Sequence, residues 1–189
     1  METEIRTLCV LLFLFAAALP LAADEEAPEP PSLLGPVSRA EIEEAEPEWV
    51  AAQTEAELDG EAARALGSVE PGAEIDVYLG TWCSDSQREL ARFWRALDEN
   101  LGIVPFEVSY VAVDRSDKRP PELLRDLDLR YVPTFIVRRD GREVGRMVEV
   151  SPNGVERDLL TLLTGEVEGV VSARDDLGEP PAAAAGDGG

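Results

Sequence analysis

The chain has 189 residues, no histidine, 17 basic and 39 acidic side chains, and two cysteines. Without imidazole it cannot form a Ser/His/Asp or Cys/His catalytic relay, a zinc site of mixed cysteine and histidine ligands, or a haem attachment site. The formal net charge of −22 disfavours nucleic acid and anionic lipid as partners, because such a charge repels phosphate. The length suits one domain with additional segments.

The first 23 residues have the pattern of a secretory signal peptide. An apolar run at 8–19 (LCVLLFLFAAAL) ends shortly before Ala23 and an acidic stretch. The run is shorter than a membrane-spanning helix requires, and Ala23 with Leu21 fits a cleavage site. We therefore expect a periplasmic or secreted protein. Glu2 and Glu4 depart from the usual positive start of a signal peptide, so a retained membrane anchor is the alternative.

Cleavage after Ala23 would remove Cys9 and leave Cys83 as the single cysteine of the mature protein. An internal disulfide would then be impossible, and any disulfide would join Cys83 to another molecule. Composition divides the rest of the chain into four parts. These are an acidic, proline-rich linker at 24–37, an N-terminal helical extension at 38–70, the main domain at 71–165, and a disordered tail at 166–189.

The extension opens with a capping box, because Glu41 follows Ser38 by three residues. Its apolar positions predict one or two helices interrupted at Pro47. These positions are Ile42, Trp49, Val50, Leu58, Ala62, Ala63 and Leu66.

The main domain begins with a predicted strand at 74–79, whose Ile75, Val77 and Leu79 share one face. A sharp turn at 80–83 then leads into a helix at 84–101. The apolar stripe of this helix comprises Leu90, Phe93, Trp94 and Leu97. The next apolar segment, 106–113, predicts a buried central strand.

Four more elements complete the predicted domain. Pro120 and Pro121 start a short helix that runs through Leu127. Strands at 134–138 and 143–150 form a hairpin across Asp140-Gly141. A last helix begins after Ser151-Pro152 and stops at Gly165. This order predicts an α/β fold whose sheet is covered by helices on both faces.

Two segments resemble the thioredoxin family: Trp82-Cys83-Ser84-Asp85-Ser86 after the first strand, and Val132-Pro133-Thr134 before the hairpin. The chain is most similar to exported bacterial thioredoxin-like proteins with a G-T-W-C-x-D-S segment and a later G-R-x-V-E stretch, here 145–149. The resemblance implies a thioredoxin-like fold with a central mixed sheet, helices on both faces and an N-terminal helical extension.

Cys83 is the candidate reactive group. At the start of a helix it would face unpaired backbone N–H groups and the positive end of the helix dipole, which stabilise a thiolate, while Asp85 would act in the opposite direction. In the family a second cysteine resolves the mixed disulfide. Ser86 occupies that position here and cannot form a disulfide, although its hydroxyl can donate to the Cys83 thiolate. The family commonly has a buried acidic residue on the first strand, and Val77 occupies that position here.

The resemblance further implies that Pro133 is cis and lies against Cys83, and that the backbone of Val132 pairs with a bound peptide. The expected site thus comprises Trp82, Cys83 and Ser86 as catalytic residues, with Val132, Pro133 and Thr134 binding substrate. We expect Trp82 to be exposed in the groove and Trp94 to lie in the core.

These site residues are compatible with two functions. In the first, Cys83 forms mixed disulfides with exported proteins or small thiols, and an external thiol completes the cycle. In the second, the domain is a redox-inert binding module that uses the groove beside Pro133, with Cys83 as a packing residue. A Cys83-linked dimer is a third possibility. We expect no cofactor, no metal and no nucleic-acid partner.

Overall fold

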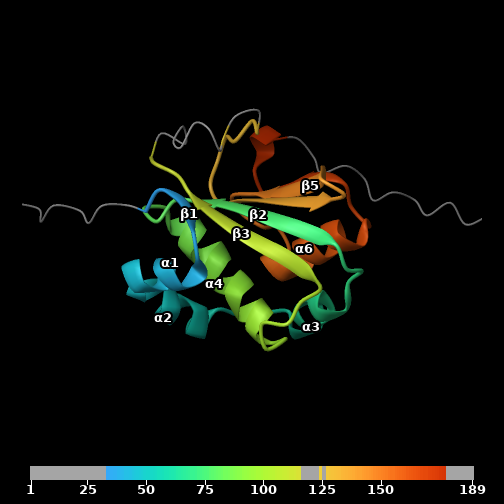
Figure 1. Ribbon diagram of the computed structural model, residues 1–189, viewed down its shortest axis with the longest axis horizontal. Helices are drawn as coiled ribbons and strands as arrows, with labels where there is room; N and C mark the ends of the chain where they lie inside the picture. The colour runs from blue at the N-terminus through green and yellow to red at the C-terminus, as the bar shows by residue number, and fades with distance from the viewer. Residues whose placement is uncertain (1–32, 116–123, 125–126, 178–189) are drawn as a thin grey trace, which may run out of the picture. The chain divides into compact units, whose positions relative to one another are not determined.

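A six-stranded mixed sheet organises the chain in the computed structural model, which describes residues 33–115, 124 and 127–177 (Figure 1). The strand order is β1-β3-β2-β4-β5-β6, with parallel pairing of β2 with β3 and of β5 with β6. The strands are β1 (Gly35–Val37), β2 (Ala73–Leu79), β3 (Phe106–Ala112), β4 (Thr134–Arg139), β5 (Arg142–Val148) and β6 (Gly169–Val171). This arrangement confirms the predicted α/β class and its mixed sheet.

The core lies between the sheet and two long helices, α4 (Ser84–Asp98) and α6 (Val155–Thr164). The predicted inner face of β2 is fully buried, since Ile75, Val77 and Leu79 are each 0% exposed. The predicted stripe of α4 is buried against the same cluster. Burial of these apolar side chains is the main stabilising contribution to the fold.

Three shorter helices lie between β1 and β2 in the chain: α1 (Arg39–Ala45), α2 (Pro47–Glu55) and α3 (Gly60–Ala65), followed by the 3₁₀ turn η1 (Leu66–Ser68). The predicted capping box is present, with the Glu41 N–H donating to Ser38 Oγ at 3.2 Å. Ile42 and Trp49 belong to the core, whereas Val50, predicted as an apolar contact, is exposed. Trp49 is the one buried residue of α2, because this short helix presents a narrow face to the core.

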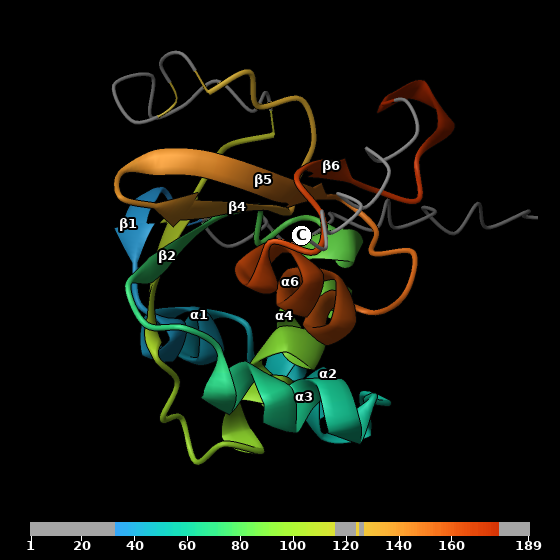
Figure 2. The ribbon, with the colours of Figure 1, turned by 90° about the vertical axis from the view of Figure 1, so that its right-hand side faces the viewer.

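All five α-helices described lie on one side of the sheet, as Figure 2 shows. The helix that we expected on the second face, from Pro120 through Leu127, lies outside the described residues apart from helical Leu124 and from Leu127. The predicted signal peptide and Cys9 also lie outside them. Within the described part of the chain, no helix combines the length and apolar character needed to cross a membrane.

Both ends of the described chain differ from the prediction. The last three residues of the predicted linker form β1, which pairs antiparallel with β3. Likewise β6 and the 3₁₀ turn η2 (Asp175–Leu177) lie in the segment predicted as a disordered tail. Each of these elements has three residues, which is too short for a periodic apolar pattern to develop. The sheet therefore extends beyond the predicted domain at both ends.

The strand β3 was predicted to be central and buried, and this was wrong. It lies one place from the edge, next to three-residue β1, and only its two end residues, Phe106 and Ala112, are fully buried. The centre of the sheet is instead β2 and β4. The predicted hairpin of β4 and β5 is confirmed, with both turn residues, Asp140 and Gly141, at positive φ.

A buried ion pair joins α3, α4 and α6. The Glu156 side chain is fully buried and accepts hydrogen bonds from Arg92 Nε at 2.6 Å and Nη2 at 2.5 Å. It also accepts the backbone N–H of Asp59, the N-cap of α3, at 2.8 Å. The N-cap of α6, Gly154, has φ +99°, and a Cβ there would overlap the Arg92 guanidinium. We call the Arg92–Glu156 ion pair the buried anchor. Together with the bond from Asp59, it ties the N-terminal extension to the main domain.

Candidate functional site

The turn after β2 places Cys83 at the start of α4, as predicted. The Cys83 N–H donates to Gly80 O at 3.0 Å, and the Cys83 carbonyl accepts the Gln87 N–H at 3.0 Å. Cys83 is the N-cap residue with extended backbone angles, φ −105° and ψ 119°, and its side chain makes no capping hydrogen bond. The backbone thus closes the turn and the helix, while the sulfur is directed elsewhere.

The sulfur meets the loop that precedes β4. The Val132–Pro133 peptide is cis, as the family resemblance implied, and both side chains are buried. Cys83 Sγ donates to Val132 O at 3.4 Å, a bond that exists only while the sulfur carries its proton. Cys83 itself is half-buried. The Cys83 sulfur and the loop predicted to bind substrate are therefore in direct contact.

Ser86 has a role in the turn that the sequence did not predict. Its side chain is fully buried, and Oγ accepts the Gly80 N–H at 3.2 Å. Within the residues that the structure describes, no hydrogen bond joins it to Cys83. Ser86 thus stabilises the turn from the first turn of α4.

Gly80 and Trp82 shape the other side of the turn. Trp82 Nε1 donates to Val113 O at 3.1 Å, and the Arg115 guanidinium lies 5.4 Å from the indole centre. A Cβ on Gly80 would lie 2.5 Å from the indole, so only glycine permits this packing. Trp82 is half-buried, in contrast to the predicted exposure in the groove, because it lies over the backbone of the turn. Trp94 is fully buried, as predicted.

The cis-proline loop is also held from its far side. Thr134 Oγ1 donates to Tyr131 O at 2.7 Å, and the Glu149 N–H donates to Pro133 O at 2.7 Å. Thr134 is 1% exposed, so its hydroxyl supports the loop and does not reach solvent. Of the three residues predicted to bind substrate, Val132 and Pro133 form hydrogen bonds through their backbone carbonyl groups, whereas the Thr134 side chain stabilises the loop.

Two residues that complete this support, Arg174 and Asp176, come from the chain after β6 and were not predicted from the sequence. The Arg174 guanidinium lies 3.8 Å from the Tyr131 ring centre and donates to Glu149 Oε2 at 2.6 Å and to Asp176 Oδ1 at 2.7 Å. Tyr131 Oη donates to Asp176 Oδ2 at 2.7 Å. We call these four residues the C-terminal clamp. Within the predicted tail, the apolar pair Val170-Val171 followed by Arg174 was the one sequence feature that could have indicated the clamp.

Hydrogen bonds within the clamp shift the pKa values of two of its groups. The hydrogen bonds from Arg174 and Tyr131 lower the pKa of Asp176 to about 2. The same bond to Asp176 raises the pKa of the Tyr131 hydroxyl. Asp176 is therefore ionised, and Tyr131 protonated, across the whole range of physiological pH.

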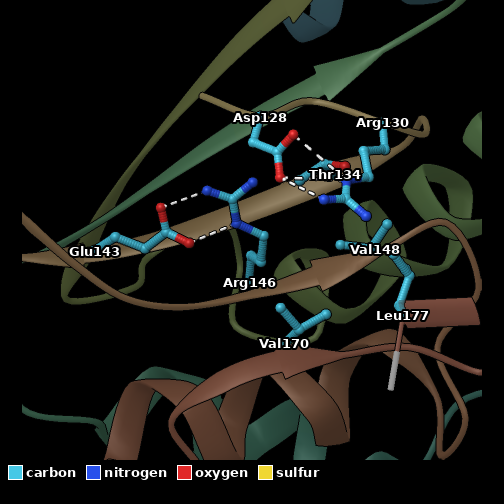
Figure 3. A pocket seen from close by; sticks show the side chains of 8 residues that line it. All are labelled: Asp128, Arg130, Thr134, Glu143, Arg146, Val148, Val170 and Leu177. Atoms are coloured by element: carbon cyan, nitrogen blue, oxygen red, sulfur yellow. Dashed lines mark hydrogen bonds and ion pairs between the residues drawn. The ribbon is translucent and has the colours of Figure 1, made fainter. Parts of the chain in front are cut away.

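A separate hollow of about 350 Å³ lies beside β4, β5 and β6 (Figure 3). Two ion pairs line it, Asp128 with Arg130 and Glu143 with Arg146. Each charge in its wall thus has an opposite charge beside it, which leaves no net preference for a charged ligand. Of the predicted site residues only Thr134 reaches this hollow. Across residues 33–115, 124 and 127–177, no group of three acidic or cysteine side chains is placed to hold a metal ion.

No protein-family model and no curated protein matches the sequence. The structure is similar to a protein of unknown function from Pseudomonas aeruginosa, at 18% identity and a TM-score of 0.43, over 68% of this chain and 82% of that one. It is also similar to thioredoxin f2 of Chlamydomonas reinhardtii, at 23% identity and a TM-score of 0.35, over 57% and 91% of the two chains. Reduced Schistosoma mansoni thioredoxin pre-protein shares 25% identity, with a TM-score of 0.35 over 56% and 91%.

The internal evidence for the fold is the chain's own topology. A parallel β2–α4–β3 unit is followed by a cis-proline, an antiparallel hairpin and a final helix on the α4 side of the sheet. The cysteine at the start of α4 contacts the residue before that proline. The chain thus has the α/β thioredoxin-like fold that the sequence predicted.

Proposed function

We propose that this chain is an exported monothiol protein that exchanges Cys83 with the disulfides of protein or small-molecule partners. One observation carries the proposal: the half-buried sulfur lies at the start of α4, 3.4 Å from the carbonyl of the residue before cis-Pro133. That carbonyl belongs to the cis-proline loop, which hydrogen bonds stabilise both at Cys83 and on its far side. A partner that pairs with this loop would bring its own sulfur next to Cys83.

Formation of the mixed disulfide needs no other oxidant or reductant, and its release needs one external thiol. The Cys83 sulfur, after losing its proton to solvent, attacks one sulfur of a partner disulfide, so a new S–S bond forms and the old one breaks. The second partner sulfur leaves with the electron pair and takes up a proton. A small external thiolate then attacks the partner's sulfur in the mixed disulfide. A new S–S bond joins that thiol to the partner, and the Cys83 sulfur leaves with the electron pair and takes up a proton. An external thiol is needed because Ser86 cannot form a disulfide and Cys83 is the one cysteine of the described chain.

A kinetic assay tests this function. The mature chain is mixed with a disulfide that releases a coloured thiol, and the rate is compared with that of a seven-residue peptide copying 80–86. We expect the folded protein to react faster than the peptide, to gain one partner thiol in mass, and to lose it to added glutathione. Cys83→Ser must abolish the gain. A rate equal to that of the peptide would contradict the proposal.

A binding module without redox activity is the second candidate. The observation in its favour is that Cys83 donates a hydrogen bond and is half-buried, as a packing residue would be. Capture of partners by the immobilised protein separates the two functions. Capture that survives Cys83→Ser supports binding alone, whereas capture lost in that variant and released by a reducing agent supports exchange. A disulfide between two Cys83 residues would appear as a dimer that a reducing agent separates.

Export is part of the proposal and has its own test. The mature protein recovered from a bacterial periplasm should begin at Asp24, because cleavage after Ala23 is the expected step. A product that retains residue 1 and sediments with membranes would support the anchor instead.

A further inference from the structure

A hollow of about 380 Å³ lies beside the active turn, between α2 and α4. Its apolar lining comes from Ala91, which is 1% exposed, and from the half-buried Ala52 and Ala56. Two exposed carboxylates, Glu55 and Glu57, stand at its edge. The hollow exists because the N-terminal extension packs along α4, so it is a feature of this extension and not of the sheet.

The hollow lies within reach of a partner bonded to Cys83. Gln87, which lines it, is one helical turn beyond Cys83, and Ala91 is a second turn further. One turn of helix advances about 5.4 Å. An extended polypeptide advances about 3.3 Å per residue, so residues two to four from a partner's cysteine reach this distance.

The uncompensated charge at the hollow is negative. Arg88 pairs with Asp85 at 2.7 Å and with Glu89 at 3.1 Å, and Arg92 is held in the buried anchor. Glu55 and Glu57, by contrast, form no ion pair with any residue between 33 and 115 or between 127 and 177. An apolar patch edged by two exposed carboxylates without an ion-pair partner in the described chain favours a segment that combines an apolar and a basic side chain.

We infer that this hollow, which we call the α2–α4 groove, binds a polypeptide partner that carries an apolar and a basic residue a few positions from its reactive cysteine. The inference rests on the proposed exchange at Cys83 and specifies which partners it selects. The net charge of −22 argues against a second copy of this chain as the occupant, because two such copies repel each other.

Three peptides test the inference. Each carries a cysteine disulfide-bonded to thionitrobenzoate, then leucine two residues on, and lysine, glutamine or glutamate at the fourth position. Attack by Cys83 forms the protein–peptide disulfide and releases coloured thionitrobenzoate with the electron pair. At low ionic strength we expect the lysine peptide to react about tenfold faster than the glutamate peptide. At 0.5 M salt this ratio should fall to about two, because the contact is exposed.

The double variant Glu55→Gln/Glu57→Gln should bring the lysine and glutamate rates to within about twofold of each other. Both side chains are exposed, so the variant should keep the fold. The matched control is Glu74→Gln/Glu107→Gln, which changes the net charge equally among exposed residues at the far end of β2 and β3. The control should keep the tenfold ratio.

The outcomes separate the two proposals. Equal rates for the three peptides, or equal losses in the variant and its control, would overturn the α2–α4 groove while leaving exchange at Cys83 intact. Release from neither the peptides nor a small disulfide would count against the proposed function itself. A dimer of the chain that blocks the groove would also overturn the inference.

Discussion

Two ionic clusters stabilise different parts of the molecule, and they differ in exposure. The buried anchor encloses Glu156 completely, with Arg92 29% exposed, and joins three helices. The C-terminal clamp lies at the surface, where the Asp176 side chain is 52% exposed, and it joins the chain after β6 to the cis-proline loop. The same chemistry, a guanidinium and a carboxylate, thus occurs in two dielectric environments.

This contrast predicts different consequences of removing a charge. A buried ion pair is costly to break, because the remaining charge has lost its water as well as its partner. An exposed pair is screened by water and salt, so its loss is nearly neutral for the whole fold. We therefore expect the anchor to control global stability and the clamp to control the local geometry of the loop beside Cys83.

The largest effect should come from Glu156→Ala. It leaves the Arg92 guanidinium without its partner and the Asp59 N–H without its acceptor. We expect a loss of about 3 kcal/mol in the free energy of unfolding, at the lower end for buried pairs because Arg92 is partly exposed. Urea denaturation measures it. Glu156→Gln, which keeps an acceptor, should lose less, and a loss below about 1 kcal/mol for the alanine variant would show that the anchor is not structural.

Gly154→Ala should be the next most costly change. The residue has φ +99°, and its new Cβ would displace Arg92 from the anchor. We expect a loss of about 2 kcal/mol, from backbone strain and the disturbed ion pair. In a Glu156→Ala background the loss should be smaller, because Arg92 is then free to move. Additive losses in the double-variant cycle would contradict this coupling.

The sequence was sufficient for the site's centre but not for its supports. The inner face of β2, the turn and the position of Cys83 follow from strong local signals: alternating apolar residues, Gly80 and the start of an amphipathic helix. The role of the Ser86 hydroxyl in the turn did not follow from such a signal. Ser86 Oγ accepts the Gly80 N–H, because a buried backbone N–H needs an acceptor.

The clamp could not be predicted for a different reason. Its residues are separated by more than forty positions, from Tyr131 to Asp176, and they meet only because β6 adds to the sheet. A parallel three-residue strand has no periodic pattern of its own. Gly145 permits this pairing, since a Cβ there would lie 2.7 Å from the backbone of Gly169. Such a contact is visible only in three dimensions.

A smaller and local effect should follow Arg174→Ala. The variant removes the contacts of the guanidinium with Tyr131, Glu149 and Asp176, and so loosens the loop that presents Val132 O to Cys83. We expect the free energy of unfolding in urea to change little, because the lost contacts are exposed. Cys83 should react about threefold faster with a small disulfide, because the loosened loop holds the sulfur less firmly. Arg174→Lys should restore part of the original rate. A global loss comparable with that of Glu156→Ala would remove the distinction between the two clusters.

The smallest effect should be a pH dependence confined to the clamp. Arg174 and Tyr131 lower the pKa of Asp176 from its ordinary 3.8 to about 2. A lowered pKa means that the ionised form is stabilised on folding, so this contribution is complete above about pH 4 and is lost as the pH falls through about 2. Titration of the Asp176 carboxyl by NMR should show a midpoint near 2, and Arg174→Ala should return it toward the ordinary value. A wild-type midpoint near 4 would mean that the exposed charges of the clamp are screened apart in solution, and the clamp would then hold the cis-proline loop through the Tyr131 contact alone.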